Sequence, residues 1–359
     1  MSASPGAGRT AFIMAGGTGG HVFPGLAVAD ELRARGWKVV WIGGRAGLEA
    51  RLVPARGYAV EWIRAAALRG KGLAAALALP INLLAGFWQS ARAILRHRPD
   101  VVLGMGGYVA FPGGMMASLL ARPLVVHEQN AVAGLVNRVL ARLADRRLTA
   151  FPDALAGAEW TGNPVRAEIA AVAEPEARFA GRGGPLQLLV VGGSLGAQAL
   201  NEALPKALAL IEPSGRPAVV HQSGEKHLES LRQGYRKAEV RAEVLPFIDD
   251  MARRYAAADL VVCRAGATTV AELCAAGAAS VLVPFPHAVD DHQTANARFL
   301  AGHGAAVLLP QAELSPPRLA ALLRSLDRGS LLEMARKARA LGKPGAARAV
   351  AERCMELAA

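Results

Sequence analysis

The sequence predicts an α/β fold with two domains, each built on a parallel sheet, because one pattern of residues occurs twice. An apolar run leads into the glycine cluster GGTGGH at residues 16–21, and another leads into GGSLGA at residues 192–197. Apolar residues at helical spacing follow each cluster, in residues 22–35 and 199–211. A strand, a tight turn and a helix, repeated at a domain-sized separation, indicate two Rossmann-like domains with a cleft between them.

Strands and helices alternate through the first half of the chain. The periodicity predicts helices at residues 22–35, 113–121 and 132–143 and strands at residues 11–15, 39–42, 101–103, 124–127 and 147–149. This alternation is typical of a parallel sheet that is covered on both faces. Ligands of such sheets bind where the strands end. The loops expected to carry function are therefore residues 16–21, 104–108 and 127–130.

A break in the pattern separates the two halves. It falls at residues 162–166, and a linker-like mixture of Pro, Gly, Ala and charged residues follows at 173–184. We therefore predict domains at 1–164 and 165–344. The second half alternates again, with strands at residues 186–191, 218–221, 241–245, 259–263, 279–283 and 305–308. The last helix is predicted at residues 346–357. The C-terminal segment that contains it, about residues 345–359, is expected to pack against the first domain.

The composition indicates a globular protein. The chain has 359 residues, of which 52% are hydrophobic and 19% charged, so a large core is available. Its three cysteines, an odd number with no CxxC pair, argue against a disulfide framework or a zinc site. A reducing cytoplasm fits best. No signal peptide is expected, because the N-terminal apolar run enters the glycine turn without a cleavage-site pattern.

The formal net charge is +12, and most of the excess lies in the first half. Such asymmetry favours a polyanionic partner, which could be nucleic acid, an acidic membrane surface or a phosphorylated ligand. The alternative is that the arginine and alanine content reflects genome composition. Nucleic acid is the poorest candidate, because aromatic residues make up only 5% of the chain and no basic run interleaves with them.

Residues 72–91 carry no charge and are flanked by basic residues. Their length could span a bilayer, but Pro80 and Asn82 interrupt the segment, and it lies between two predicted strands. An amphipathic segment on an anionic membrane surface suits it better. Its expected apolar tip comprises Leu79, Ile81, Leu83, Leu84, Phe87 and Trp88. An ordinary buried helical hairpin stays open as the alternative.

The glycine turns are suited to phosphate, because their amides and the helix N-terminus can face an anion closely. A dinucleotide dehydrogenase would need an acid after the second strand, where this chain has Ile42-Gly43-Gly44-Arg45. Arg45 could meet the 2′-phosphate of NADP, so an NADP enzyme stays open as an alternative. Neither turn supplies the lysine of a P-loop. Glu272, one turn into the helix predicted at 268–276, could hold a ribose, or simply cap that helix. The pattern favours a nucleoside diphosphate in the second domain.

Six motifs, spread over nearly the whole chain, resemble the MurG family of membrane-associated N-acetylglucosaminyltransferases. They are GGTGGHVFPGLAVADEL, GMGGYV, HEQN, TGNPVR, GGSLGA and CRAGATTVAE. The resemblance implies a GT-B architecture and inverting transfer of GlcNAc from UDP-GlcNAc to the C4 hydroxyl of undecaprenyl-pyrophosphoryl-MurNAc-pentapeptide (lipid I), which gives lipid II for peptidoglycan synthesis. It also implies a peripheral protein on the cytoplasmic face of the inner membrane, with roles in cell shape and division, and no cofactor.

The resemblance assigns UDP-GlcNAc mainly to the second domain and the lipid-linked acceptor to the first. Carried over motif by motif, the donor contacts are Thr18, Gly19, Gly20, Asn130, Arg166, Ser194, Ile248, Ala267, Thr268, Thr269, Val270, Ala271, Glu272 and Gln293. The sequence departs from the family pattern at Ala110-Phe111-Pro112, at Leu195 and in the length of residues 290–293. These departures affect details of the acceptor loop and the choice between neighbours of Gln293, but not the reaction.

Inversion at the anomeric carbon needs a base for the acceptor hydroxyl and stabilisation of the departing UDP. His21 is the candidate base, because imidazole titrates near neutral pH; alternatively it binds a carbonyl or phosphate, and Glu128 or a water is the base. Tyr108, His127 and Glu128 are candidate acceptor contacts, although the first two could cap their own strands. The charge of the departing UDP would be stabilised without a metal ion. The groups that do so would be the amides of the glycine turns, Ser194, and Arg166 or Arg264.

No metal site is expected. We expect the acidic pairs at residues 249–250 and 290–291 to cap helices, because adjacent side chains on extended backbone point to opposite sides. Two other functions stay open at this stage: a UDP-GlcNAc epimerase of the same architecture, and a non-catalytic binder of nucleotide sugars or lipids. Transfer of labelled sugar onto a polyprenyl-pyrophosphoryl muramyl peptide would separate them from a transferase.

Overall fold

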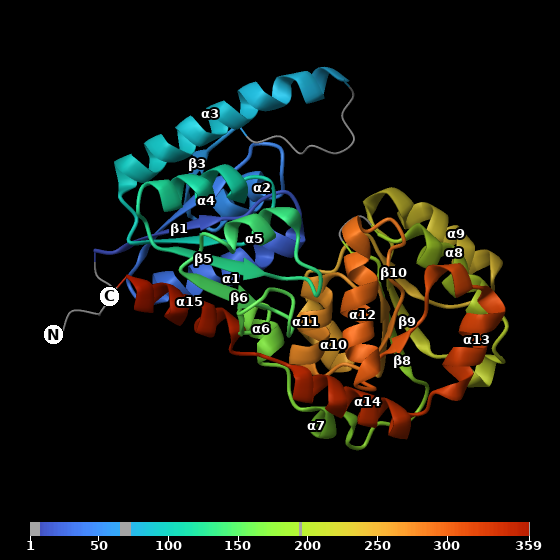
Figure 1. Cartoon of the computed structure of the whole chain (residues 1–359). Coiled ribbons are helices and arrows are strands. Elements are labelled where there is room, and N and C mark those ends of the chain that lie inside the picture. Colours follow the sequence, from blue (N-terminus) through green and yellow to red (C-terminus); the bar gives the residue numbers. More distant parts are fainter. Residues whose placement is uncertain (1–7, 65–72, 194–195, 359) are drawn as a thin grey trace. The chain divides into compact units, whose positions relative to one another are not determined.

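The computed structural model describes residues 8–64, 73–193 and 196–358, and the chain divides into two compact units. Unit 1 comprises Met1–Arg166 and Pro344–Ala359, and unit 2 comprises Ala167–Lys343. Each unit contains its own parallel sheet with helices on both faces (Figure 1). The prediction of two Rossmann-like domains with parallel sheets is therefore confirmed.

Unit 1 is built on a seven-stranded sheet of order β3-β2-β1-β4-β5-β6-β7, in which every pairing is parallel. The strands are β1 (Thr10–Met14), β2 (Lys38–Gly43), β3 (Ala59–Trp62), β4 (Val101–Gly104), β5 (Leu124–Glu128), β6 (Arg146–Thr149) and β7 (Glu159–Trp160). The helices are α1 (Gly19–Ala34), α2 (Glu49–Ala55), α3 (Leu73–His97), α4 (Ala110–Leu119), α5 (Leu135–Leu140) and α15 (Ala346–Leu357).

Strand β1, an inner strand of the sheet of unit 1, contributes to two cores, because its successive side chains point to opposite faces of the sheet. Ala11 and Ile13 pack with residues of α1 and α15, whereas Phe12 and Met14 pack with residues of α3 and α4. Figure 1 shows α3 and α4 over one face of the sheet and α1 and α15 over the other. Burial on both faces explains why β1 reads as a continuous apolar run.

Unit 2 has a six-stranded parallel sheet of order β10-β9-β8-β11-β12-β13. The strands are β8 (Gln187–Val191), β9 (Ala218–Gln222), β10 (Glu243–Leu245), β11 (Leu260–Cys263), β12 (Ser280–Leu282) and β13 (Val307–Leu308). The helices are α6 (Ala167–Ala170), α7 (Pro175–Phe179), α8 (Gln198–Ala209), α9 (Leu228–Lys237), α10 (Met251–Ala257), α11 (Ala267–Ala276), α12 (His292–Gly302), α13 (Pro316–Ser325) and α14 (Arg328–Leu341).

The structure differs from the sequence-based expectation at several elements of unit 1. Strands β3 and β7 were not predicted, because β3 is a half-exposed strand at the sheet edge and β7 has only two residues. Helix α1 begins at Gly19, three residues earlier than expected, so His21 lies in its first turn. Helix α3 is one continuous helix of 25 residues, which rules out the hairpin.

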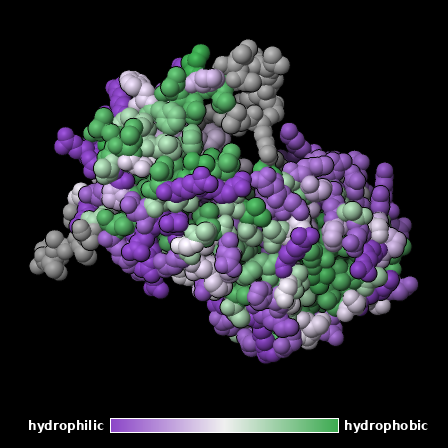
Figure 2. Space-filling model, in the orientation of Figure 1, coloured by the Kyte–Doolittle hydropathy of each residue, from purple (hydrophilic) through white to green (hydrophobic). Residues whose placement is uncertain are grey.

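None of the helices in the described part of the chain combines the length and hydrophobicity needed to cross a lipid bilayer. On α3, the exposed fractions of Ile81, Leu84 and Trp88 are 69%, 69% and 63%. Figure 2 shows apolar residues gathered on the surface of this part of unit 1. Phe87 does not belong to that surface: its ring packs against Phe111 of α4, with ring centroids 5.9 Å apart.

Candidate functional site

The first glycine turn joins β1 to the N-terminus of α1. Thr18 occupies the N-cap position in an extended conformation, but its side chain makes no capping hydrogen bond, and the residue is exposed. Gly19 and Gly20 form the start of the helix, where backbone N–H groups have no partner within the helix. This end of α1 therefore presents amides and a hydroxyl, which suit an anion.

A second loop of unit 1 packs directly on this turn. Gly107 has a φ of +79°, and a Cβ atom there would lie 2.3 Å from the carbonyl oxygen of Gly16. The Tyr108 ring lies over the turn, since a Cβ atom at Gly17 would lie 3.3 Å from its Cε1. Burial raises the pKa of Tyr108, and nearby Glu49 raises it further, so its hydroxyl stays protonated. Tyr108 therefore offers a neutral donor beside the turn.

Glu49 holds the first glycine turn from behind, a role that the sequence did not reveal. It is fully buried, and its carboxylate accepts hydrogen bonds from the N–H of Gly17 (2.9 Å) and the N–H of Gly44 (3.1 Å). A dinucleotide-binding domain has its acid at the end of the second strand, whereas Glu49 lies on α2, past the following turn. Its only sequence signal is an acid at the start of a short helix.

His21 belongs to a chain of hydrogen bonds that crosses unit 1. Nε2 of His127 donates to the carbonyl oxygen of Gly162 (2.9 Å), so its Nδ1 is the acceptor nitrogen. The amide group of Gln129 donates to this Nδ1 (3.0 Å) and to the carbonyl oxygen of His127 (2.8 Å). Oε1 of Gln129 therefore faces His21 and accepts from its Nδ1 (2.8 Å).

The direction of this chain fixes the tautomer of His21. His127 is fully buried, and burial lowers its pKa to about 4, so its ring is neutral at neutral pH. Each link then has one donor and one acceptor. Because Nδ1 of His21 donates to Gln129, the lone pair of the neutral His21 ring is on Nε2. Gln129 was not among the predicted site residues, although it stands two residues after His127 on the same side of an extended segment.

Glu128 organises the loop that carries Asn130. Its side chain is only 1% exposed, and its Oε1 accepts from the backbone N–H (2.9 Å) and side-chain amide (3.3 Å) of Asn130. Its Oε2 accepts from the N–H of Gly134 (3.1 Å) and the amide of Asn137 (2.9 Å). These hydrogen bonds make the buried Glu128 carboxylate a group that positions Asn130 and its loop.

Arg166 ends unit 1 and lies near the start of α1. Its guanidinium carbon is 6.0 Å from the centre of the Phe23 ring. That ring in turn covers Gly19, since a Cβ atom there would lie 3.0 Å from Cε2 of Phe23. The structure thus brings Arg166 to the same end of α1 as Thr18.

The second glycine turn lies between β8 and α8 of unit 2. Ser194 falls outside the described residues, so its predicted donor contact is not located. The rest of the turn is tightly packed: Gly196 has a φ of +77°, and a Cβ atom there would lie 2.0 Å from the carbonyl oxygen of Ser223. The turn therefore has no room for a side chain at Gly196. Glycines of this kind let backbone N–H groups approach a phosphate closely.

Helix α11 has an N-terminus that is suited to an anion. Its N-cap is Gly266, which has no side chain to satisfy the first amides of the helix. Thr268 lies in the first turn, and its buried Oγ1 has no hydrogen-bond partner within the described residues. Ala267 and Val270 are buried, so they would meet a ligand through the backbone. Thr269 and Ala271 are half-buried on the same helix.

Glu272 lies in the second turn of α11. It is 6% exposed, and Oε2 of its carboxylate accepts a hydrogen bond from the Tyr255 hydroxyl (3.3 Å). Gln293 on α12 ties two strand ends together, because its Oε1 accepts from the N–H groups of Ala265 (3.3 Å) and Phe285 (2.9 Å). Its Nε2 makes no hydrogen bond within the described residues and remains a donor. Ile248, which follows β10, is buried.

The acidic pairs of unit 2 do not form a metal centre. In the described part of the chain, no cluster of three or more His, Cys, Asp or Glu side chains could hold an ion. Asp250 and Asp291 stand at the N-cap positions of α10 and α12, but neither side chain makes the predicted capping hydrogen bond. Asp250 pairs with Arg254 (3.3 Å), and Asp291 accepts from the Thr294 hydroxyl (2.6 Å).

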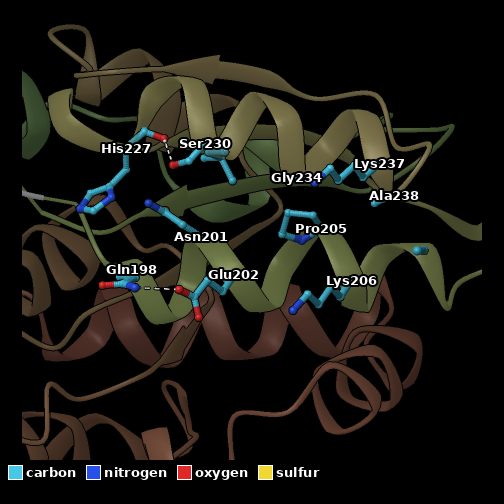
Figure 3. Close-up of a pocket in the computed structure, with 12 residues that line it drawn as sticks. Gln198, Asn201, Glu202, Pro205, Lys206, His227, Ser230, Gly234, Lys237 and Ala238 are labelled. Atoms are coloured by element: carbon cyan, nitrogen blue, oxygen red, sulfur yellow. Dashed lines mark hydrogen bonds between the residues drawn. The ribbon is translucent and has the colours of Figure 1, made fainter.

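A groove of about 580 Å³ runs between α8 and α9 (Figure 3). Pro205 and Gly234 face each other across it, and Lys206 and Lys237 lie toward one end. None of the predicted site residues lines this groove. The candidate residues of unit 2 that the structure describes lie instead on α11, on α12 and after β10.

Comparisons with known proteins identify the family of the chain. The glycosyltransferase family 28 N-terminal domain matches residues 11–149, and the family 28 C-terminal domain matches residues 187–351. The chain is 67% identical over 351 residues to a protein of Aromatoleum aromaticum, with 98% of each chain covered. It is 64% identical over 350 residues to a protein of Azoarcus sp., again with 98% of each covered. Both are named UDP-N-acetylglucosamine--N-acetylmuramyl-(pentapeptide) pyrophosphoryl-undecaprenol N-acetylglucosamine transferase.

Solved structures show the same fold. A crystal structure of MurG from Acinetobacter baumannii superposes with a TM-score of 0.86 at 40% identity, covering 97% of this chain and 99% of that one. The glycosyltransferase of kitacinnamycin superposes with a TM-score of 0.68 at 21% identity, covering 96% of this chain and 98% of that one. At this identity the similarity shows the fold alone. Two parallel-sheet units with phosphate-suited turns thus define a glycosyltransferase of the GT-B architecture. The chain belongs to glycosyltransferase family 28, and within it to the MurG family.

Proposed function

We propose that this chain transfers GlcNAc from UDP-GlcNAc to the C4 hydroxyl of undecaprenyl-pyrophosphoryl-MurNAc-pentapeptide, with inversion at the anomeric carbon. The names of its full-length relatives support these substrates. The observation that carries the proposal is the hydrogen-bond chain that leaves Nε2 of His21 as the proton acceptor. A base at the end of a phosphate-suited turn is what a single displacement on a UDP-sugar requires.

The proposed reaction is one in-line displacement. Nε2 of His21 takes the proton of the acceptor C4 hydroxyl, and this oxygen forms a bond to the anomeric carbon of GlcNAc. The bond from that carbon to the β-phosphate oxygen of UDP breaks, and UDP leaves with its electron pair. Gln129 and His127 act as positioning residues, because they hold Nδ1 of His21 as a donor throughout.

The departing UDP is stabilised in this proposal by unit 2. The uncapped N-terminus of α11 and the backbone of the second glycine turn present amides to the pyrophosphate, and Ser194 adds a hydroxyl. Glu272 holds the ribose, and the free amide of Gln293 and the backbone at Ile248 complete this part of the donor set. In unit 1, the donor contacts are Thr18, Gly19, Gly20, Asn130 and Arg166. No step uses a metal ion.

The same proposal makes the protein a peripheral membrane protein. Ile81, Leu84 and Trp88 form an exposed apolar stripe along α3, defined here as the α3 stripe. The Arg92 guanidinium lies 5.6 Å from the centre of the Trp88 ring, which places positive charge beside this surface. Apolar residues with a basic fringe suit an anionic membrane face. The three buried cysteine thiols, none in a disulfide, fit the reducing, cytoplasmic side of the inner membrane.

The test is a transfer assay with labelled UDP-GlcNAc and a polyprenyl-pyrophosphoryl muramyl-pentapeptide in detergent. The expected product is a lipid-linked disaccharide with a β-1,4 bond, formed equally well in the presence of a chelator. Release of labelled N-acetylmannosamine nucleotide instead would indicate an epimerase. Donor binding without any turnover would indicate a binding protein, and a strict requirement for a divalent ion would overturn the metal-free mechanism.

A further inference from the structure

A pocket of about 600 Å³ lies in unit 1, beside the first glycine turn but distinct from it. Its walls come from the segments that follow β2 and β3, from the loop that carries Tyr108, and from one side of α3. The residues that matter here are Arg45, Trp62, Arg64, Asn82, Gln89 and Tyr108. Its size is that of a small-molecule site, and the roles assigned above use only Tyr108.

Two arginines of this pocket carry uncompensated charge. Arg45 and Arg64 are exposed, and in the described ranges no carboxylate or carbonyl oxygen accepts a hydrogen bond from either guanidinium. The Arg45 guanidinium carbon lies 5.3 Å from the centre of the Trp62 ring, which holds that side chain at the pocket wall. The nearby acid, Glu49, is already bound to two backbone amides behind the turn. The pocket therefore presents two free guanidinium groups to solvent.

Helix α3 fixes the wall of the pocket. The side-chain oxygen of Gln89 accepts a hydrogen bond from the backbone N–H of Arg64 (2.6 Å). Gly86 lets the helix approach that segment, because a Cβ atom there would lie 2.8 Å from the carbonyl oxygen of Arg64. The position of Arg64 is thus set by the helix that carries the α3 stripe.

The geometry of α3 also relates the pocket to the membrane-facing surface. Successive residues of an α-helix are rotated by about 100° around its axis. Asn82 and Gln89 are therefore on one side of α3, and the α3 stripe is on another side. Arg92 and Arg96 lie on the helix surface between the two sides. Around the circumference of α3, the order is therefore the apolar α3 stripe, the basic residues and the polar wall of the pocket. This order matches a molecule with a lipid chain joined to an anionic head.

We propose that this pocket binds the pyrophosphate bridge of the lipid-linked acceptor, with Arg45 and Arg64 as its charge partners and the amides of Asn82 and Gln89 and the hydroxyl of Tyr108 as further donors. The inference rests on the proposed function. Guanidinium groups are well suited to paired phosphate oxygens. A single phospholipid phosphate would use only part of a pocket with this many donors.

The loop of residues 106–108 separates the pocket from His21, and one acceptor sugar could extend across it. Tyr108 lines the pocket, whereas a Cβ atom at Gly106, two residues earlier, would lie 3.0 Å from Cε1 of His21. In a pyranose, C1 and C4 stand at opposite ends of the ring. A pyrophosphate on C1 in the pocket would therefore place the C4 hydroxyl across the Gly106–Tyr108 loop, toward the base.

The test compares the double variant Arg45→Gln/Arg64→Gln with the wild type in detergent, with the acceptor and donor varied separately. The KM for the acceptor is expected to rise about tenfold or more, because charge-assisted hydrogen bonds to phosphate are lost, while the KM for UDP-GlcNAc changes less than about twofold. The matched control is Arg51→Gln/Arg142→Gln, which removes two exposed charges of unit 1 outside the pocket and should change neither KM. A second variant, Asn82→Asp, keeps both arginines and should also raise the acceptor KM.

Binding of farnesyl pyrophosphate and farnesyl monophosphate, measured without turnover, separates this proposal from the proposed function. The wild type should bind the pyrophosphate more tightly, and the double variant should lose that preference, even if the transfer assay fails. An unchanged acceptor KM with an unchanged pyrophosphate preference would overturn the proposal. So would loss of binding to phosphatidylglycerol vesicles with an unchanged acceptor KM, which would assign the arginines to phospholipid head groups.

Discussion

Nδ1 of His21 lies 2.8 Å from Oε1 of Gln129, and this contact determines which nitrogen of His21 is free. Gln129 can present its oxygen to His21 because its amide group is already bound to Nδ1 and the carbonyl oxygen of His127. Burial keeps His127 neutral, so the whole chain has one direction. The chemistry proposed for His21 thus depends on two residues that need not touch a substrate.

Replacement of Gln129 tests this dependence. We expect Gln129→Ala to lower kcat about 10- to 100-fold, because His21 loses the acceptor that fixes its tautomer and ring orientation. The KM for UDP-GlcNAc should stay within about twofold. The matched control is Gln198→Ala, an exposed glutamine whose amide contacts only Glu202 among the described residues. An equal loss in both variants, or a rise in donor KM without a fall in kcat, would contradict the positioning role.

The buried histidines make stability depend on pH. Burial lowers the pKa of His127 to about 4 and that of His221 to about 3, whereas an unfolded histidine titrates near about 6.5. Between these values the unfolded chain binds protons that the folded chain does not, so the free energy of unfolding falls as the pH decreases from about 6.5 toward 4. At pH 5 each histidine should account for about 2 kcal/mol of the loss.

Urea unfolding at pH 7.5 and pH 5 checks this expectation. In His221→Gln the loss between the two pH values should be about 2 kcal/mol smaller than in the wild type. The control is His303→Gln, which removes an imidazole from the surface and not from the core. The same loss in all three proteins would show that buried histidines do not control acid stability.

The α3 stripe should govern membrane binding without supporting the fold. We expect Ile81→Ser/Leu84→Ser/Trp88→Ser to weaken binding to vesicles that contain phosphatidylglycerol more than tenfold, since each buried apolar side chain contributes about 1.5 kcal/mol or more. The Tm should change little, because these residues are 63–69% exposed. The control is Leu210→Ser in unit 2, where the leucine is 52% exposed. Unfolding of the triple variant would instead assign the stripe to the core.

Gly107 should tolerate no side chain. In Gly107→Ala the new Cβ atom would overlap the carbonyl oxygen of Gly16, so the Tyr108 loop and the first glycine turn would separate. We expect kcat/KM to fall at least tenfold. Gly57→Ala is the control, because Gly57 also has a positive φ (+76°) but nothing within 4 Å of its Cβ position. If both variants lose the same activity, backbone strain rather than the close contact explains the effect.

The sequence predicted the parallel sheets well because buried strands read as short apolar runs between glycine turns and helices. It missed β3, whose residues are partly exposed at a sheet edge and show no such run. It placed the start of α1 too late, because Gly19 and Gly20 are poor helix formers and only tertiary packing draws them into the first turn.

The candidate site was predictable where a motif carries the chemistry, and not where a role depends on a distant partner. His21 and the α11 turn stand in glycine-rich motifs, so their residue types were informative. Glu49 binds the amide of Gly17 from 32 positions away, and Gln129 reaches His21 across 108 positions. Contacts at such separations have no local pattern. For the same reason, the sequence does not show that Glu128 accepts hydrogen bonds from Asn130 and Asn137.

The turnover of His21→Ala, measured with labelled UDP-GlcNAc and the lipid-linked acceptor, tests most directly whether His21 is the base. The affinity of this variant for the donor is measured beside it by calorimetry. If Nε2 of His21 takes the acceptor proton, kcat should fall at least about 100-fold while the Kd for UDP-GlcNAc stays within about twofold. A kcat within about threefold of the wild type, with a normally folded protein, would show that another group is the base.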